Sequence, residues 1–277
     1  MNCPNCQNKS IKFIREIEVT QKKISSKLIY CSSCDFLYLQ DPTWLDIAYQ
    51  TEFYGDTGYV NRNFIFANRT ILIFRIWKLL SKKSLVPDAC DIGAGLGMYA
   101  RMMRDKGYNF FGSDEYSKMS LLNPFVVRDS QCVIKSSFEV VEHLPSLTEF
   151  LKEKVNKVDF FLFSTELRQS GHIPNINWWY YSFSLGQHIG FHSKKSLEVA
   201  FAKAGYNSDN LVSFGNSFHA LANTRNWKLA FKIASYFWRI NYYFTKFCNQ
   251  LIGLIFNEKS LTIKDSKYAL DLFKNKN

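Results

Sequence analysis

The chain has 277 residues, of which 47% are hydrophobic and 21% are charged, and its formal net charge at pH 7 is +11. This length and apolar content suit one main domain with additions. The sequence shows no apolar core of signal-peptide type, and nowhere do about 18 uncharged apolar residues run together, as a membrane-spanning helix requires. We therefore expect a cytoplasmic protein. The positive charge indicates an anionic partner, and a nucleotide-sugar phosphate, RNA and an acidic membrane surface all fit it.

Four of the seven cysteines form two Cys-x-x-Cys pairs, Cys3 with Cys6 and Cys31 with Cys34. In a reducing compartment this arrangement favours a metal over disulfides. Four thiolates on two turns predict one tetrahedral Zn²⁺, which is structural because protein ligands fill all four positions. So small a segment cannot bury enough apolar surface alone, so the metal supplies its folding energy. Alternating apolar residues between the pairs predict two short strands, and we assign residues 1–40 to a zinc ribbon.

A linker and a long helix are predicted next. Residues 36–60 are aromatic and rich in turn-forming residues. Residues 63–83 carry apolar residues at helical spacing and end in lysines, which a helix C-terminus favours. We expect this helix to precede the first strand of the main domain and to cover the face that holds the cofactor.

A strand, a glycine turn and a helix start are predicted over residues 86–103. The turn has an acid, Asp91, followed by Gly93, Gly95 and Gly97, a G-x-G-x-G spacing that differs from the G-x-G-x-x-G of dinucleotide-binding proteins. Glycines there let the backbone approach a ligand closely and leave amide groups at a helix N-terminus. A tight connection without a ligand is the alternative.

With its preceding acid, this turn resembles motif I of class I S-adenosylmethionine (SAM) dependent methyltransferases, D/E-x-G-x-G-x-G. The resemblance implies SAM as the cofactor, bound by Asp91, Gly93, Ala94, Gly95 and Gly97. Residues 36–60 resemble the linker of zinc-ribbon methyltransferases, in which a Y-x-x-x-Y-like run closes over the cofactor. This second resemblance implies that Tyr54 and Tyr59 close over the cofactor. A hydrophobic strap across the sheet is the alternative for these tyrosines.

An acid follows the next predicted strand. Residues 108–111 are aromatic and lead into Asp114 and Glu115. In a nucleotide-binding βαβ unit, an Asp or Glu roughly 20 residues after the glycines accepts hydrogen bonds from the ribose hydroxyls. We assign this role to Asp114, with Glu115 as a cofactor-site neighbour that points the other way; a solvated loop acid is the alternative. No clear acid for the adenine amino group follows, so backbone and apolar contacts would hold the adenine.

The run F-E-V-V-E-H-L, residues 138–144, resembles the F-E-V-x-E-H-L segment that follows the fourth strand in a large group of these methyltransferases. The resemblance implies that Phe138 and Glu139 line the methionine end of SAM and that Glu142 and His143 begin the next helix. A direct catalytic role for His143 is one hypothesis, and capping or buttressing that helix is the other. Residues 158–167 then form a near-continuous apolar run, which is typical of a central parallel strand.

Residues 177–192 resemble the WWY-x5-GQHI-x-F loop of SAM methyltransferases encoded with glycosyltransferases in bacterial surface-polysaccharide clusters. The resemblance implies a sugar acceptor. Trp178, Trp179 and Tyr180 offer flat apolar faces with polar edges, which are suited to stacking on a sugar or a base. We therefore predict that these three residues bind the acceptor.

Gln187 and His188, in the same loop, would supply directed hydrogen bonds to the acceptor. Methyl transfer to a hydroxyl requires that the acceptor loses its proton, and an imidazole has a pKa near neutrality for this task. We predict that His188 is the base, and we rank His192 and His172 lower. The alternative is that the aromatic residues belong to the core and that His188 holds the loop through neutral hydrogen bonds.

Residues 193–207 predict a capped helix that ends at a glycine, and residues 210–216 and 217–223 predict two strands that complete a seven-stranded sheet. The tail then predicts a helix whose basic and polar residues follow one narrow stripe: Lys228, Lys232, Ser235, Arg239 and Lys246. Such a helix either lies on an anionic membrane surface, which would place the protein at the inner face of the membrane, or packs on protein. Packing is the favoured alternative.

The residues and the resemblance together predict an α/β fold, with a Rossmann-like, seven-stranded class I methyltransferase sheet, an N-terminal zinc ribbon and a helical C-terminal extension. We assign residues 41–84 to the linker and cofactor-covering helix, 85–224 to the methyltransferase domain and 225–277 to the extension. The predicted activity is methyl transfer from SAM to oxygen of a nucleotide sugar or surface glycan. An RNA methyltransferase and a non-catalytic SAM-binding scaffold are the alternatives. No N/D-P-P-[YF] tetrapeptide follows the fourth strand, which disfavours methylation of base amino groups.

Overall fold

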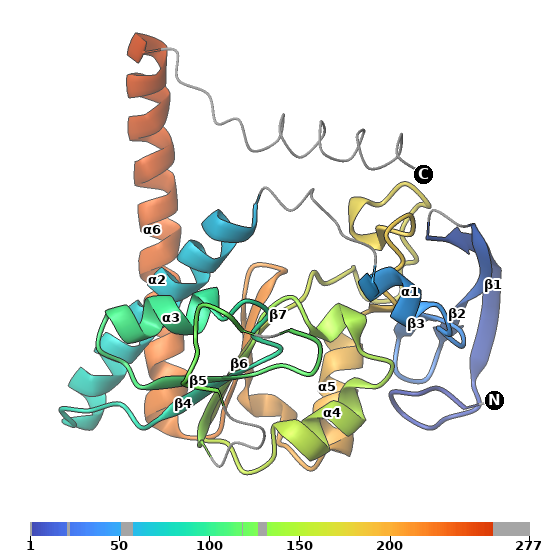
Figure 1. Cartoon of the computed structure of the whole chain (residues 1–277), viewed down its shortest axis with the longest axis horizontal. Coiled ribbons are helices and arrows are strands. Elements are labelled where there is room, and N and C mark those ends of the chain that lie inside the picture. Colours follow the sequence, from blue (N-terminus) through green and yellow to red (C-terminus); the bar gives the residue numbers. More distant parts are fainter. Residues whose placement is uncertain (1, 21–22, 51–57, 118, 127–131, 257–277) are drawn as a thin grey trace.

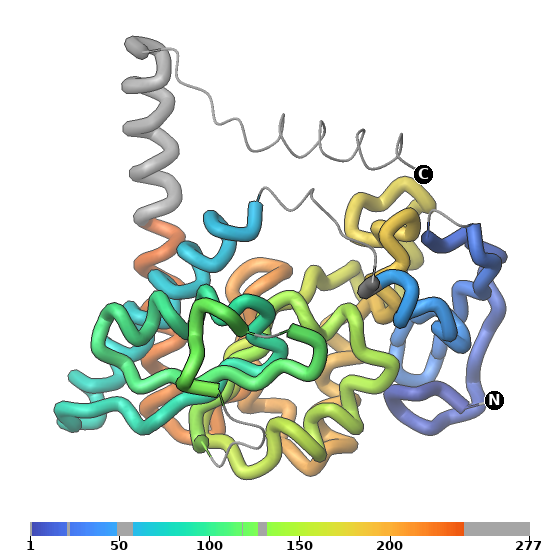
Figure 2. The backbone as a smooth tube through the Cα atoms, viewed as in Figure 1, coloured from blue at the N-terminus to red at the C-terminus, as the bar shows by residue number. Residues whose placement is uncertain are grey.

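The computed structural model describes residues 2–20, 23–50, 58–117, 119–126 and 132–256, with the backbone alone for residues 49–50 and 241–256. Within these residues the chain forms two β-sheets (Figure 1). The N-terminal sheet lies at one end of the molecule and helix α6 (Arg225–Phe256) rises at the other, with the main sheet between them. The path of the backbone through both sheets can be followed in Figure 2.

The N-terminal sheet is antiparallel and has the order β1-β2-β3-β8. Strands β1 (Ile11–Val19) and β2 (Ile24–Cys31) confirm the two strands predicted between the cysteine pairs, and β3 (Phe36–Leu39) adds a third. The fourth strand, β8 (Gly190–Phe191), comes from the loop predicted to bind the acceptor. The N-terminal sheet is therefore continuous with that loop.

The main sheet has the strand order β5-β4-β6-β7-β10-β9. Strands β5, β4, β6 and β7 are parallel, and the β9–β10 hairpin joins antiparallel to β7. The sequence predicts seven strands, whereas the described residues form six, and an isolated parallel bridge beyond β5 joins Gly112 to Val126. The six strands are β4 (Ala89–Ile92), β5 (Phe110–Ser113), β6 (Ile134–Ser137), β7 (Phe160–Ser164), β9 (Leu211–Phe214) and β10 (Phe218–Ala222).

Helices cover both faces of the main sheet, which gives three layers (Figure 1). Helices α2 (Tyr59–Ser81), α3 (Met98–Asp105) and α6 pack on one face, and α4 (Leu147–Lys154) and α5 (Lys194–Lys203) pack on the other. Along β7, Phe160 and Leu162 join the first core, and Phe161 and Phe163 join the second. Because successive side chains of a strand point to opposite faces, this apolar run buries both. The remaining described elements are α1 (Leu45–Gln50) and the short 3-10 helices η1 (Val141–His143), η2 (Trp179–Tyr181) and η3 (Ser208–Asn210).

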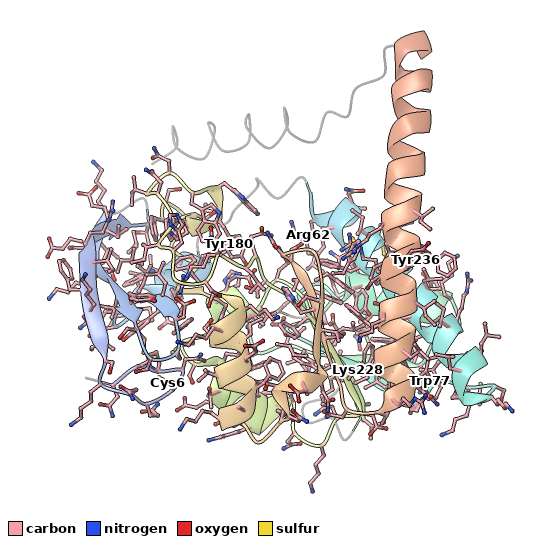
Figure 3. The ribbon with its side chains drawn as sticks, turned by 180° about the vertical axis from the view of Figure 1, so that it is seen from behind. Cys6, Arg62, Trp77, Tyr180, Lys228 and Tyr236 are labelled. Carbon is pink, nitrogen blue, oxygen red and sulfur yellow. The ribbon has the colours of Figure 1, made fainter. Side chains whose placement is uncertain are left out.

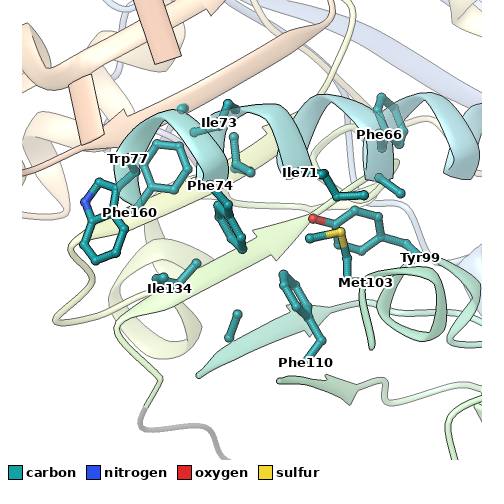
Figure 4. Packing of buried hydrophobic residues seen from close by; sticks show 14 of the residues in the cluster. Phe66, Ile71, Ile73, Phe74, Trp77, Tyr99, Met103, Phe110, Ile134 and Phe160 are labelled. Carbon is teal, nitrogen blue, oxygen red and sulfur yellow. The ribbon is translucent and has the colours of Figure 1, made fainter. Parts of the chain in front are cut away.

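Helix α2 lies across the sheet and confirms the helix predicted over residues 63–83. Its residues Phe66, Phe74 and Trp77 belong to the core on this face of the strands (Figure 4). Trp77 also stacks on Trp227 of α6, with the ring centroids 4.4 Å apart. Helix α2 is thus fixed against α6 as well as against the sheet.

The first half of α6 packs on protein, as the favoured alternative predicts. Its buried residues are Trp227, Ala230, Phe231 and Ala234. Lys228 of the predicted stripe donates from Nζ to the backbone oxygen of Asp209 (2.7 Å). Lys246 belongs to the part of α6 described by its backbone alone, and membrane contact stays a prediction. Among the described helices, none combines the length and the apolar content needed to span a bilayer.

The first cysteine pair docks at the N-termini of α4 and α5. Asn5 Nδ2 donates to the backbone oxygen of Ser196 (3.0 Å), and Thr148 Oγ1 donates to the backbone oxygen of Asn5 (2.7 Å). Ser146, the N-cap residue of α4, donates from Oγ to the backbone oxygen of Pro4 (2.8 Å). These bonds hold the N-terminal turn against the main domain.

Candidate functional site

The predicted site residues converge at the carboxyl ends of the parallel strands. The glycine turn follows β4, Asp114 follows β5, Glu139 follows β6 and Thr165 follows β7. The chain passes from β4 to β5 on one side and returns to β6 on the other, so the direction of strand addition reverses between β4 and β6. Open α/β sheets bind their ligands in the crevice at such a reversal.

The glycine turn adopts a backbone that suits glycine and excludes side chains. Gly93 and Gly97 have φ angles of +72° and +82°. A Cβ added at Gly93 would lie 2.5 Å from Val140 Cγ2, and one at Gly97 would lie 2.6 Å from Leu122 Cβ. Any larger residue would therefore clash and strain the backbone. Helix α3 begins directly after Gly97, as the sequence predicts.

Tyr59, the first residue of α2, reaches the middle of the glycine turn. A Cβ built on Gly95 would lie 3.4 Å from Tyr59 Oη. Tyr59 therefore lies where the resemblance implies a residue that closes over the cofactor. The other candidate, Tyr54, lies outside the described residues.

Asp114 ties the glycine turn to the end of β5. Its Oδ2 accepts a hydrogen bond from the Gly95 amide (2.8 Å), and its Oδ1 accepts from the amides of residues 116 and 117 (2.8 and 2.7 Å). A carboxylate offers about four acceptor positions, so Oδ2 keeps one acceptor position besides the bond from Gly95. Glu115 points away from the turn and pairs with Lys154 Nζ (3.0 Å).

Asp91 is buried beneath the turn, where Ser136 Oγ donates to its Oδ1 (2.6 Å). Burial raises the pKa of Asp91 to about 7; the Ser136 hydrogen bond opposes this rise, and the charge of Asp114 adds to it. Because a carboxyl group with this pKa is partly protonated at neutral pH, Asp91 presents less than a full negative charge to the turn.

Phe138 and Glu139 follow β6, next to α2. Phe138 stacks on Phe66 of α2, with the ring centroids 4.3 Å apart. Glu139 Oε1 accepts a hydrogen bond from Ser164 Oγ (2.8 Å), and Glu139 Oε2 lies 3.4 Å from Arg62 Nε. Arg62 thus reaches from α2 to the end of β6.

Glu142, His143 and His188 meet just beyond β6, and we call them the Glu-His-His cluster. His143 Nε2 lies 3.9 Å from Glu142 Oε1, and the two imidazole rings pack edge to face with centroids 5.0 Å apart. Each residue offers one potential ligand atom, and these atoms lie within 4.8 Å of one another. The structure therefore joins residues from two separate sequence motifs.

The tautomer of His188 is set by its neighbour. Nδ1 lies 2.7 Å from the backbone oxygen of Tyr180, which can only accept, so Nδ1 carries the proton and Nε2 keeps its lone pair. Burial lowers the pKa of His188, and burial together with His188 lowers that of His143 to about 3. Both imidazoles are therefore neutral at physiological pH. Burial raises the pKa of Glu142, and the charge of Glu139 adds to this rise.

The aromatic residues of the loop over residues 177–192 divide between core and surface. Tyr180 and Tyr181 are buried in the core of the N-terminal sheet, whereas Trp178 lies at its edge and Trp179 is 70% exposed. Figure 3 shows Tyr180 at the same edge of the molecule as Arg62. Tyr180 thus fits the core alternative, and the two tryptophans remain able to contact an acceptor.

Gln187 anchors its own loop to the linker. Its Nε2 donates to the backbone oxygen of Ala48 at the end of α1 (3.2 Å). The neighbouring Gly186 accepts a hydrogen bond at its backbone oxygen from Trp44 Nε1 (2.7 Å). The segment before His188 is therefore anchored to the linker, and the predicted contact between Gln187 and the acceptor stays a prediction.

A hollow of about 640 Å³ lies beside Trp178, within the roughly 300–1,000 Å³ of small-ligand sites. Its side chains are mainly polar and include Glu166, Gln169, Asn175, Asn177, Trp178 and Asn216. The Tyr180 ring lies 5.4 Å from the Trp178 ring and 4.8 Å from the His188 ring, between centroids. The hollow therefore lies next to the Glu-His-His cluster, separated from it by Tyr180.

A family described as a methyltransferase domain matches residues 68–211, more than half of the chain. The chain belongs to the methyltransferase-domain family. The matched residues include the glycine turn, Asp114 and the Glu-His-His cluster. No curated protein sequence matches this chain.

Three solved structures are similar to this chain. Human N-acetylserotonin methyltransferase in complex with SAM has 13% sequence identity and a TM-score of 0.38, and the match covers 50% of this chain and 48% of that chain. Mitomycin 7-O-methyltransferase has 11% identity and a TM-score of 0.37, with 64% of this chain and 62% of that chain covered. Magnesium protoporphyrin IX methyltransferase from Synechocystis PCC 6803 with bound SAM has 14% identity and a TM-score of 0.36, with 64% of this chain and 89% of that chain covered. The chain spans about half the length of the first of these.

The four cysteines of the two Cys-x-x-Cys pairs lie together as the sequence predicts. Cys3 Sγ lies 3.6 Å from Cys34 Sγ, and Cys6 Sγ lies 3.7 Å from Cys31 Sγ. Thiolates about 2.3 Å from a tetrahedral Zn²⁺ lie about 3.8 Å from one another, whereas disulfide-bonded sulfurs lie about 2.05 Å apart. All four cysteines are buried. The set therefore fits a tetrahedral metal and leaves no open ligand position.

Sequence reasoning does not identify two arginines that contact site or cysteine-site residues. Arg62 reaches Glu139 from α2, and Arg168, which follows β7, pairs with Asp35 (2.8 Å) beside the second cysteine pair. No local pattern marks either arginine, because each partner lies far along the chain. The available signal is Asp35 itself, an acid directly after Cys34.

Proposed function

We propose that the chain transfers a methyl group from SAM to a hydroxyl of a sugar acceptor, either a nucleotide sugar or a surface glycan. The observation that carries the proposal is the placement of His188. Its imidazole has a defined neutral tautomer and lies beyond β6, on the edge of the sheet that bears the glycine turn and Asp114. It also lies next to the polar hollow at Trp178.

The residues present fit SAM. Asp114 Oδ2 keeps an acceptor position for the ribose, the glycine turn bears no side chain that would fill the space, and Tyr59 reaches the turn. When bound, SAM supplies a methyl group on a positively charged sulfur. Glu139, aligned by Ser164 and Arg62, would face the methionine end of the cofactor.

Replacing Asp114 by alanine is expected to weaken SAM binding by roughly 1.5–3 kcal/mol, because the ribose hydroxyls lose a charged acceptor. Isothermal titration calorimetry with SAM measures this change. Glu115→Ala is the matched control, since Glu115 pairs with Lys154 away from the turn. Equal losses in the two variants, or none in Asp114→Ala, would contradict the assignment of the ribose site.

The hollow at Trp178 has the chemistry of a sugar site. An indole face suits the apolar face of a pyranose ring, and amide side chains both donate and accept hydrogen bonds, as sugar hydroxyls do. The hollow holds such amides at Asn175, Asn177 and Asn216. The net charge of +11 suits the phosphates of a nucleotide sugar.

His188 would take the acceptor proton through Nε2. As the hydroxyl oxygen accepted the methyl group, its proton would pass to His188, and the sulfur would keep the electron pair of the carbon–sulfur bond. His143 is the weaker base, because its pKa is about 3. Catalysis comes chiefly from holding donor and acceptor in line, and the base adds to it.

An assay with methyl-labelled SAM tests the proposal against a panel of nucleotide sugars, glycans and RNA. We expect label in a sugar acceptor, and His188→Ala should lower kcat by about 10²–10⁴-fold without changing SAM affinity. Because burial lowers the pKa of His188, the rate should fall only when the pH drops below the ordinary imidazole range. Label in RNA alone would mean that the acceptor is RNA and not a sugar. SAM binding without any labelled product would favour a non-catalytic scaffold.

We also propose that the four-cysteine site binds a structural Zn²⁺. The sulfur separations support this assignment, and the site has no position for a substrate. The ion would stabilise the N-terminal sheet. Because β3 pairs with β8, it would also hold the segment that follows His188 in place.

A further inference from the structure

Glu142 is the fully buried acid of the Glu-His-His cluster. Its side chain is 0% exposed, and within the described residues neither carboxylate oxygen has a partner at ordinary hydrogen-bond geometry. The Tyr180 hydroxyl and the charge of Arg62 favour the charged form of Glu142. Buried charges are normally paired or coordinate a metal. Glu142 has no task in the proposed methyl transfer.

The groups that face Glu142 are potential metal ligands. His143 Nε2 lies 3.9 Å from Glu142 Oε1, and one atom from each of Glu142, His143 and His188 lies within 4.8 Å of the other two. Ligands bound at about 2.0–2.2 Å to one ion lie up to about 4.4 Å apart. Small side-chain rotations would therefore bring all three atoms onto one cation.

His188 is already oriented as a metal-bound histidine usually is. Nδ1 donates to the Tyr180 backbone oxygen (2.7 Å), which fixes the ring and leaves the Nε2 lone pair for a ligand bond. The backbone around it is fixed too, because the Ile189 amide donates to the backbone oxygen of Glu142 (2.9 Å). Two of the three candidate ligands are thus held together by the fold before any ion binds.

We propose that Glu142, His143 and His188 bind one divalent first-row transition-metal ion, such as Mn²⁺, Fe²⁺, Co²⁺ or Zn²⁺. Two imidazoles and one carboxylate suit these ions, whereas Mg²⁺ and Ca²⁺ prefer oxygen ligands. Three protein ligands leave positions open for an acceptor oxygen. This site is separate from the four-cysteine site, whose ligands are all sulfur.

The inference rests on the proposed function and changes the route of the proton. The ion would bind the acceptor hydroxyl and make it more acidic. The proton then leaves to water, the oxygen forms its bond to the methyl carbon, and the carbon–sulfur bond breaks with its electron pair on sulfur. The ion is neither oxidised nor reduced, and His188 acts as a ligand while the ion is present.

Electron paramagnetic resonance titration of the full chain with Mn²⁺ tests the site directly, with zinc retained at the four cysteines. We expect one Mn²⁺ per chain, and Glu142→Ala and His188→Ala should each weaken its binding by at least tenfold. His172→Ala, on an exposed loop, is the matched histidine control and should leave the Mn²⁺ affinity unchanged. No bound Mn²⁺ in the wild-type chain, or equal binding in all variants, would overturn the proposal.

A second measurement uses the wild-type protein, so its result does not depend on whether the variants fold. Electron spin-echo envelope modulation of the bound Mn²⁺ should show coupling to two imidazole nitrogens, and the absence of this coupling would also overturn the proposal. Because Mn²⁺ binding needs neither SAM nor an acceptor, the two proposals fail separately. Mn²⁺ binding with no methyl transfer to any acceptor would reject the proposed function alone, and methyl transfer without Mn²⁺ binding would reject the metal site alone.

Discussion

Removing the proposed metal from the four-cysteine site is expected to unfold the N-terminal sheet and to abolish methyl transfer while SAM binding persists. Zinc binding in small zinc domains has an apparent free energy of about 10–16 kcal/mol, which acts as folding free energy. The strands β1 to β3 have too small a core to replace it.

The segment that carries His188 depends on that sheet. Strand β3 pairs with β8, and the Leu39 amide donates to the backbone oxygen of Ile189 (2.9 Å), one residue after His188. The Ile189 amide in turn donates to the backbone oxygen of Glu142 (2.9 Å). Ile189 thus links the N-terminal sheet to the Glu-His-His cluster. The glycine turn and Asp114 follow β4 and β5 in the main sheet, so SAM affinity should survive.

Chelation of the purified protein tests this expectation. Far-ultraviolet circular dichroism and limited proteolysis report the loss of the N-terminal sheet, and calorimetry with SAM reports the main domain. Cys34→Ser should reproduce the effect of chelation, whereas Cys132→Ser, outside the cysteine cluster, should not. Full methyl transfer by zinc-free protein would contradict the link between β8 and the site.

The parts of the fold that the sequence predicts depend on local patterns. The glycine spacing and the acid after the next strand place the turn and Asp114 correctly, because both belong to one strand-turn-helix unit. The apolar run of β7 indicates a strand buried on both faces. Ser193 caps α5 and forms a capping box with Ser196, within four residues of sequence.

The remainder depends on contacts between distant segments. Strand β8 has two residues, too few for any periodicity, and it exists because β3 offers an edge to it. The adjacent Trp178, Trp179 and Tyr180 look alike in sequence, yet only Tyr180 enters the core, because the turn at η2 directs it inward. Sequence spacing identifies the two motifs of the Glu-His-His cluster separately and does not show that they meet.

Replacing Asp35 by alanine is expected to lower the free energy of unfolding by about 3–5 kcal/mol, as for other buried ion pairs that lose one partner. Asp35 lies directly after Cys34, and its Oδ1 accepts from Arg168 (2.8 Å) and from the Tyr30 hydroxyl (2.9 Å). Its Oδ2 accepts from the Gly171 amide (3.0 Å). Without the carboxylate, the buried Arg168 guanidinium keeps its charge and loses its counter-ion.

The Asp35–Arg168 pair should also affect how the free energy of unfolding changes with pH. Burial alone raises the pKa of Asp35, but hydrogen bonds from Ser193, Arg168 and Tyr30 and the Arg168 charge outweigh it, so the pKa lies below its usual value. The unfolded carboxyl group has a pKa of about 3.9. The contribution of Asp35 is therefore complete above that pH and is lost as the pH falls through the lower folded-state pKa. Asp35→Ala should lack this acid-dependent loss.

Urea unfolding of the zinc-loaded protein at pH 7 and at acid pH measures both effects. The matched control is Asp105→Ala, which breaks the Arg101–Asp105 pair on the surface of α3, where both side chains are more than 40% exposed. An exposed pair contributes at most about 1 kcal/mol, so the free energy of unfolding of this variant should be close to that of the wild type. Equal stability losses in the two variants would mean that the bond from Arg168 to Asp35 does not hold the N-terminal sheet to the main domain.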